Sequence, residues 1–196
     1  MTEPTGTRGP ARRPMRADAR RNYEQLLVVA RSAFAEHGID ASLDDIARRA
    51  EVGNATLYRH FPTRQALLEA VHRDQIEALC AEAQTLLAAP SPAEALTTWL
   101  RAVAAHGSTS RGLLATLTAA LHDGGSDLSG CRTAIFTAAS NLLTRAQRAR
   151  AVQPDITVSQ LLKLVNAITF ATEGEPDGGA QAEQLLKLLM DGIRSR

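Results

Sequence analysis

Apolar residues recur every three to four positions along most of the chain, and this spacing limits the fold more than any other feature. The alternation of apolar and polar residues that marks a half-buried β-strand is not convincing anywhere. The sequence therefore predicts an all-α fold of about nine helices. Their approximate ranges are 17–37, 42–50, 55–61, 63–87, 91–105, 112–122, a longer helix ending near 151, 157–172 and 180–194.

Residues at the predicted helix ends support these boundaries. Gly38 follows the first helix at the position where a left-handed residue commonly ends a helix. Ser42, with Asp45 three residues later, has the spacing of a capping box, and Thr63 is placed to cap the fourth helix. Ser91 precedes a proline and then a glutamate, which is a strong helix start.

The composition is that of an ordinary globular protein. The 196 residues are 44% hydrophobic and 22% charged, which argues against a largely disordered, collagen-like or disulfide-stapled chain. No apolar run approaches the ~20 residues that span a bilayer, and no apolar stretch follows the basic start as it would in a secretory signal. We therefore expect a cytoplasmic protein without a membrane partner. Cys80 and Cys131 fit a reducing compartment and form no metal-ligand pair.

Positive charge is concentrated at the amino terminus. The net charge of the whole chain is +1, whereas the first 22 residues hold six arginines against Glu3 and Asp18. Residues 1–16 contain three prolines and no helical periodicity, so we predict a disordered basic arm. Such an arm suits a polyanionic partner, although a solvated tail would have the same composition.

The strongest local signal is the segment 42–61, in which two short helices are joined by a tight turn containing Gly53. The first helix has one apolar face. The second starts at Asn54, a potential cap, and points Leu57 and Phe61 inward. Its other side chains suit contacts with DNA: Asn54, Thr56, Tyr58, Arg59 and His60. The pattern indicates a helix-turn-helix, and an αα-hairpin inside an all-α protein is the alternative.

Residues 20–79 resemble the amino-terminal domain of TetR-type transcriptional repressors. The matching segments are Ala33–Gly38, Ser42–Ala47, Val52–Phe61 and Arg64–Leu68. The resemblance implies a DNA-binding domain over 20–79. It also implies a helical domain for ligand binding and dimerisation over 80–196, where only the architecture matches.

The resemblance also implies DNA contacts for eight residues: Ser42, Asn54, Ala55, Thr56, Tyr58, Arg59, His60 and Arg64. Ser42 and Tyr58 would meet phosphates, and Arg59 and His60 would point towards the groove or the backbone. Arg64 stands where the family usually has a lysine, which keeps the charge but changes the geometry. The residues Gly53–Ala55 also depart from the common pattern, so the family's base preference does not transfer.

The remaining helices are expected to hold a pocket and a dimer interface. The pocket follows mainly from the resemblance, with these candidates: Trp99, His106, Phe136, Asn141 and Phe170. The last two helices carry apolar residues on more than one face, which indicates a four-helix bundle with a second copy. The interface candidates are Leu161, Val165, Ile168, Leu185 and Leu189. Burial of the extra face inside a larger monomer core is the alternative.

Signals for catalysis are poor. No nucleophile elbow, dinucleotide fingerprint, phosphate loop or Cys-x-x-Cys occurs. One Glu-x-x-His, from Glu69 to His72, lacks the second motif that a di-iron site needs. We therefore predict no catalytic residues, metal or cofactor. We expect a homodimeric repressor that binds a pseudo-palindromic double-stranded operator and is released by an unknown small molecule. A helical ligand-binding or scaffold protein that does not bind DNA is the main alternative, and a small metal-dependent enzyme is the third.

Overall fold

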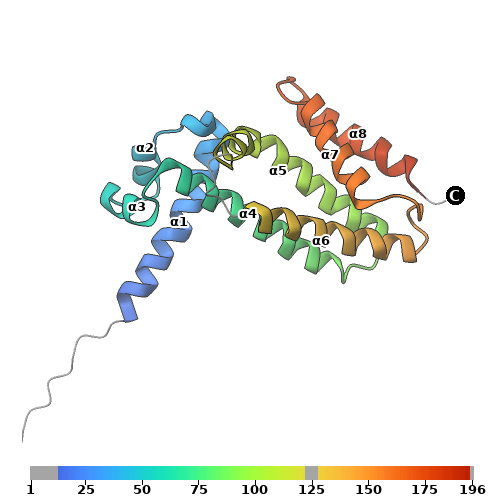
Figure 1. The fold of residues 1–196 in the computed structure, drawn as a ribbon, viewed down its shortest axis with the longest axis horizontal. Coiled ribbons are helices and arrows are strands. Elements are labelled where there is room, and N and C mark those ends of the chain that lie inside the picture. Colours follow the sequence, from blue (N-terminus) through green and yellow to red (C-terminus); the bar gives the residue numbers. More distant parts are fainter. Residues whose placement is uncertain (1–12, 122–127, 195–196) are drawn as a thin grey trace, which may run out of the picture.

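A computed structural model describes residues 13–121 and 128–194 of the chain. These residues form eight α-helices, one short 3₁₀-helix and no β-strand, which confirms the all-α prediction (Figure 1). No helix in this described part combines the length and apolar character needed to cross a lipid bilayer. In chain order the helices are α1 (Arg13–His37), η1 (Gly38–Asp40), α2 (Leu43–Arg49), α3 (Asn54–His60), α4 (Arg64–Leu86), α5 (Pro92–Leu121), α6 (Leu128–Arg148), α7 (Val158–Ala171) and α8 (Gly178–Gly192).

Helix α5 is continuous where the sequence predicts two helices, over 91–105 and 112–122, so that prediction was wrong. A single glycine inside a helix costs only about 1 kcal/mol relative to alanine, which is too little to end a well-packed helix. Gly107 also lies where α5 closely approaches α7. A Cβ atom at this position would lie 3.2 Å from Cγ2 of Thr169, so the missing side chain permits the packing.

Three of the predicted side-chain caps are present. The hydroxyls of Ser42, Thr63 and Ser91 each accept a hydrogen bond from the backbone N–H three residues later. Gly38 has φ +69°, the left-handed conformation that ends α1. Side-chain caps therefore fix the starts of α2, α4 and α5 from local sequence alone.

Helix α1 begins at Arg13, so the last four residues of the arm predicted to be disordered are helical. The rest of the arm, residues 1–12, lies outside the described residues. In Figure 1 the first turns of α1 project away from the body of the molecule, on the side of α3. The prediction of a disordered arm is thus wrong for 13–16 and stays a prediction for 1–12.

Two hydrophobic cores share one helix. The first core is formed by the four helices α1, α2, α3 and α4 and contains residues such as Leu26, Ile46 and Leu57. The second joins the end of α4 to α5–α8 around the fully buried Trp99. Helix α4 contributes Leu67, Leu68 and Val71 to the first core and Ala83 to the second, so this one helix connects the two cores.

Candidate nucleic-acid interface

Helices α2 and α3 form the helix-turn-helix that the sequence predicts. Ile46 and Ala47 of α2 and Leu57 of α3 are buried in the first core, so the pair is fixed by its apolar side. The turn between them contains Glu51 with φ +53°, a left-handed conformation that is uncommon for a residue other than glycine. The amide of Val52 donates to the carbonyl of Ala47 at 2.9 Å, which closes the turn.

The outer face of α3 is open to solvent. Asn54, Ala55, Tyr58 and Arg59 are exposed, whereas Thr56 is half-buried. Gly53 is the N-cap, so Asn54 is the first residue of the helix and does not cap it as predicted. Since the first residues of a recognition helix contact base edges, this face is the candidate for DNA recognition.

Asn54 has a partner that the sequence reasoning missed. Its Nδ2 donates to Oδ1 of Asp44 on α2, at 2.8 Å. The two residues are ten positions apart, and the contact depends on the geometry of the turn between the helices. No local sequence pattern therefore predicts this hydrogen bond. It joins the amino-terminal ends of the two helices at the exposed surface.

Arg64 is directed towards the chain rather than fully into solvent. Its Nη1 donates to the carbonyls of Ile39 and Ala41, at 2.8 and 2.5 Å, and the side chain is partly buried. These bonds hold the segment that leads into α2, a role that the sequence reasoning missed. The remaining guanidinium N–H groups leave a phosphate contact possible, and that contact stays a prediction.

His60 packs against α1 beside the candidate recognition face. Its ring is half-buried, packs edge-on against Tyr23 of α1 at 5.9 Å between centroids, and lies 6.2 Å from Phe61. Nε2 of His60 is buried as well. The physical reason is helical spacing, because position 60 follows the inward Leu57 by three residues. The predicted contact of His60 with the groove or the DNA backbone stays a prediction, and the structure adds its packing against Tyr23.

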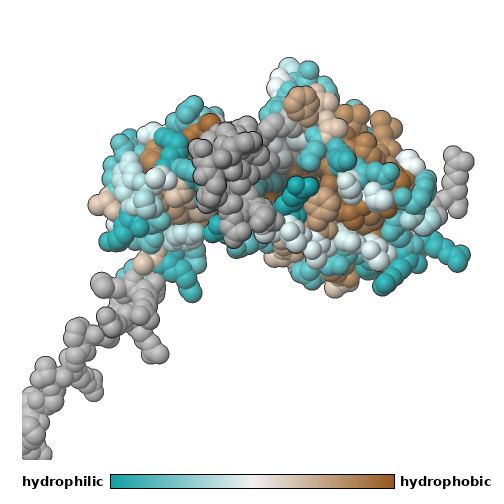
Figure 2. Space-filling model, viewed as in Figure 1, coloured by the Kyte–Doolittle hydropathy of each residue, from teal (hydrophilic) through white to brown (hydrophobic). Residues whose placement is uncertain are grey.

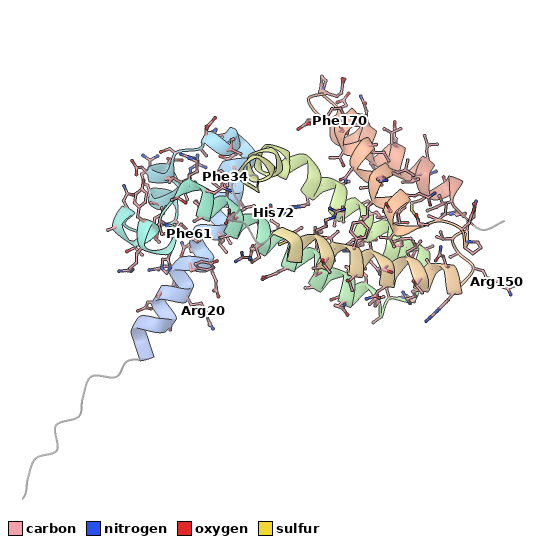
Figure 3. All side chains as sticks on the ribbon, in the orientation of Figure 1. Arg20, Phe34, Phe61, His72, Arg150 and Phe170 are labelled. Atoms are coloured by element: carbon pink, nitrogen blue, oxygen red, sulfur yellow. The ribbon has the colours of Figure 1, made fainter. Side chains whose placement is uncertain are left out.

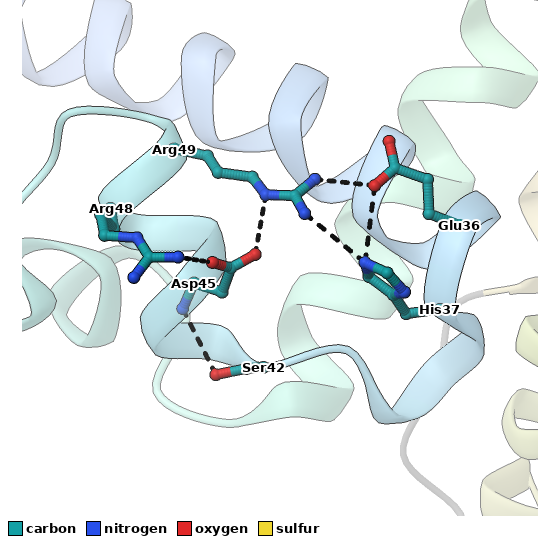
Figure 4. A network of polar contacts seen from close by, with 6 residues as sticks. All are labelled: Glu36, His37, Ser42, Asp45, Arg48 and Arg49. Atoms are coloured by element: carbon teal, nitrogen blue, oxygen red, sulfur yellow. Dashed lines mark hydrogen bonds and ion pairs between the residues drawn. The ribbon is translucent and has the colours of Figure 1, made fainter.

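An ion-pair network connects α1 to α2 beside the helix-turn-helix (Figure 4). Arg49 donates to Glu36 of α1 at 2.8 Å and pairs with Asp45 of its own helix at 2.7 Å. Hydrogen bonding to Arg49 lowers the pKa of the Glu36 carboxyl, and the same contact raises the pKa of Arg49. All three side chains meet solvent, so the network orients α2 more than it stabilises the fold.

Within the described part of the chain, the five predicted pocket residues lie in different surroundings, and the pocket itself stays a prediction. Trp99 is 0% exposed and donates Nε1–H to the carbonyl of Leu79 at 2.9 Å, so it is a core residue. Asn141 and Phe170 are exposed at the surface. Phe136 lines an open groove of about 480 Å³ in the described part of the chain, together with Arg132, Thr133, Thr137, Ser140 and Val158. The sequence placed these residues correctly on helices but could not assign their faces.

His106, the fifth candidate, forms a stacked pair with His72. The ring of His72 on α4 is 5% exposed and lies 5.6 Å from that of His106 on α5, between centroids. Burial lowers the pKa of both imidazoles, and for His106 the neighbouring His72 and Arg31 add to the effect and bring the pKa to about 4. The pair occupies the junction of the two cores, where Figure 3 labels His72.

No three metal-ligating side chains gather in the described ranges, 13–121 and 128–194. The two residues of the Glu-x-x-His motif make other contacts. Its histidine packs against His106, and Glu69 accepts a hydrogen bond from Gln65 at 3.0 Å.

Two of the five predicted interface residues face the monomer core. Leu161 and Val165 are both 0% exposed, so they cannot contact a second copy, and this part of the prediction is corrected. Ile168 and Leu189 are half-buried, and Leu185 is exposed. Helix α7 has two apolar faces, and the sequence alone did not say which one meets the core.

The other face of α7 and α8 is apolar and open. Phe170 is 72% exposed and Leu188 is 66% exposed, and Leu164 and Leu185 are exposed as well. Figure 2 shows hydrophobic residues gathered over these two helices. The exposed end of α7 with Phe170 is labelled in Figure 3.

A helix-turn-helix on its own small core, linked by α4 to a larger helical domain, defines a DNA-binding transcriptional regulator. The profile "Bacterial regulatory proteins, tetR family" matches residues 26–71. The profile "Transcriptional regulator SbtR-like, C-terminal domain" matches residues 91–195, more than half of the chain. The chain belongs to the TetR family of bacterial transcriptional regulators, as its amino-terminal motifs predicted.

Solved structures agree with this assignment along nearly the whole chain. The TetR transcriptional regulator SCO0520 from Streptomyces coelicolor is 38% identical, with a TM-score of 0.78, over 88% of this chain and 98% of that one. A TetR transcription regulatory protein from Mycobacterium vanbaalenii is 35% identical, with a TM-score of 0.72, over 92% and 99%.

A curated repressor matches a shorter segment. The HTH-type transcriptional repressor KstR2 from Mycolicibacterium smegmatis is 37% identical over 76 residues. That segment is 38% of this chain and only 37% of the repressor's length.

Proposed function

We propose that the protein is a homodimeric repressor that binds a pseudo-palindromic operator and leaves it when a small molecule binds. The observation that carries this proposal is the presence of two exposed surfaces on helices that α4 connects. The outer face of α3 suits DNA, and the apolar face of α7 and α8 suits a second copy. The protein would act by binding rather than by catalysis, in the cytoplasm where bacterial DNA lies.

DNA binding would use the exposed residues of α3 and the phosphates beside them. Electrophoretic mobility shifts with the DNA that flanks its own gene test this directly. Replacing both Tyr58 and Arg59 with alanine should weaken binding at least tenfold, since each lies exposed on the recognition helix. Arg150→Ala is the matched control, because this arginine lies at the opposite end of the molecule (Figure 3). Unchanged binding by the double variant would contradict the use of α3 for recognition, and the absence of any shift by the wild type would favour a helical protein that does not bind DNA.

Dimerisation is supported by the exposed face of α7 and α8. A large contiguous apolar surface usually marks an interface, and a short recognition helix contacts too few base pairs to select an operator alone. Light scattering after gel filtration should give twice the chain mass of 21.0 kDa. Leu188→Asp should give monomers, whereas Val28→Asp, at an exposed apolar residue of α1, should not. A wild-type mass near that of one chain would refute the dimer.

Release by a small molecule is typical of TetR-family regulators, and thermodynamic linkage between ligand binding and DNA binding explains how it can occur. The dimer can have one conformation in which the two recognition helices fit the operator and another in which their spacing does not fit. A ligand that binds the second conformation more tightly lowers the DNA affinity by its differential affinity for the two conformations. Aromatic residues are only 4% of the chain, which favours an aliphatic ligand over a flat aromatic one. Long-chain fatty acids are therefore the first panel to add to the DNA complex. If the protein–DNA complex persists with every compound of this panel, the result would count against an aliphatic effector.

A further inference from the structure

Asn54 is the first residue of α3, and its side chain is exposed on the face proposed to meet DNA. An asparagine amide has one acceptor oxygen and one NH₂ donor group of similar shape. A free amide can therefore turn over and present either group to a base. Its contribution to base choice depends on whether something fixes its orientation.

Asp44 supplies that constraint. Its Oδ1 accepts the Nδ2–H of Asn54 at 2.8 Å. An ionised carboxylate only accepts hydrogen bonds, so the reversed amide would place Oδ1 of Asn54 against a carboxylate oxygen. The amide is thereby held with Nδ2 towards α2 and Oδ1 on the opposite side.

We propose that Asp44 is a positioning residue for DNA recognition, which orients Asn54 so that its Oδ1 and one remaining N–H meet a base with an exocyclic amine. Adenine presents N6–H₂ as donor and N7 as acceptor in the major groove, and cytosine presents N4–H₂. Guanine and thymine present carbonyl acceptors at the corresponding place, which oppose Oδ1. This inference rests on the proposed function, because it concerns the operator that the repressor would select.

Asp44 could instead act only through its charge. A carboxylate close to the phosphates repels them equally on every sequence, and its removal would strengthen binding uniformly and steepen the salt dependence. The two explanations differ in base preference, because only the orienting contact distinguishes one base from another.

The experiment is selection from a randomised double-stranded DNA library by the full-length chain. The wild type, Asn54→Ala, Asp44→Asn, Asp44→Ala and the double variant with alanine at both positions are compared. Asp44→Asn keeps the shape of the side chain and removes its charge, and its amide can pair with Asn54 in either orientation. Asp40→Asn is the matched control, since Asp40 is an exposed acid of the neighbouring η1.

We expect the base position that loses its preference in Asn54→Ala to hold adenine or cytosine in the wild type. The wild-type preference there should be about tenfold, and both Asp44 variants should reduce it to under about threefold. The Asp44→Ala change should have no further effect in the Asn54→Ala background, and Asp40→Asn should leave the preference intact.

Three results would overturn the inference: an unchanged preference in both Asp44 variants, guanine or thymine at the position, or no position that responds to Asn54→Ala. Each leaves DNA binding itself intact. Failure of the wild type to enrich any sequence would instead overturn the proposed function, and this inference with it.

Discussion

Replacing His106 should flatten the pH dependence of folding stability. The pKa of this imidazole is about 4 in the folded chain, against 6.5 for an unperturbed histidine, because of burial, the neighbouring His72 and the charge of Arg31. The unfolded chain therefore binds a proton more tightly than the folded one. The contribution of His106 is complete above pH 6.5 and is lost as the pH falls from 6.5 towards 4.

The magnitude follows from these two pKa values. One pKa unit corresponds to 1.36 kcal/mol, so the whole loss is about 3 kcal/mol. About 2 kcal/mol of it falls between pH 7 and pH 5, which is a large share of the 5–15 kcal/mol that stabilises a typical domain. The loss should loosen the junction between α4 and α5, where the His72–His106 pair lies.

Urea unfolding at pH 7 and pH 5, followed by circular dichroism, measures the effect. The wild type should lose about 2 kcal/mol more than His106→Asn between the two pH values, since asparagine does not titrate. His106→Gln serves as a second variant, and His37→Asn, at an exposed histidine of α1, is the control. Equal losses in the wild type and in both His106 variants would refute the role of this buried imidazole.

Three further substitutions test the packing by the free energy of unfolding in urea. Trp99→Phe should cost about 1–3 kcal/mol, because it removes the indole hydrogen bond to the carbonyl of Leu79 and part of a fully buried side chain, and a neutral result would contradict that role. Gly107→Val should destabilise the fold by about 1–3 kcal/mol through overpacking against Thr169, whereas full tolerance would mean that α5 and α7 lie further apart. Glu51→Gly should stabilise the chain by about 1 kcal/mol by relieving the left-handed backbone in the turn, and a loss of stability would show that the Glu51 side chain matters more.

The sequence by itself determined the features that depend on neighbouring residues. Apolar spacing predicted the helices, and Ser42, Thr63 and Ser91 marked helix starts that the structure confirms. The helix-turn-helix and the family followed from contiguous motifs, because capping and helical amphipathicity act over one or two turns. These features were enough to predict the all-α fold class and the position of the helix-turn-helix.

Only the tertiary structure decided which way individual side chains face. Leu161 and Val165 belong to the core rather than to an interface because α7 has two apolar faces, and packing against α5 selects one of them. The close approach of α5 and α7 at Gly107 involves Thr169, which is distant in sequence.

The same holds for the polar contacts of the candidate site. Asp44 meets Asn54, His72 meets His106, and Arg64 meets the carbonyls of Ile39 and Ala41 across separations of ten residues or more. Local propensity carries no information about such pairs, because they form only after two cores have fixed the helices against one another.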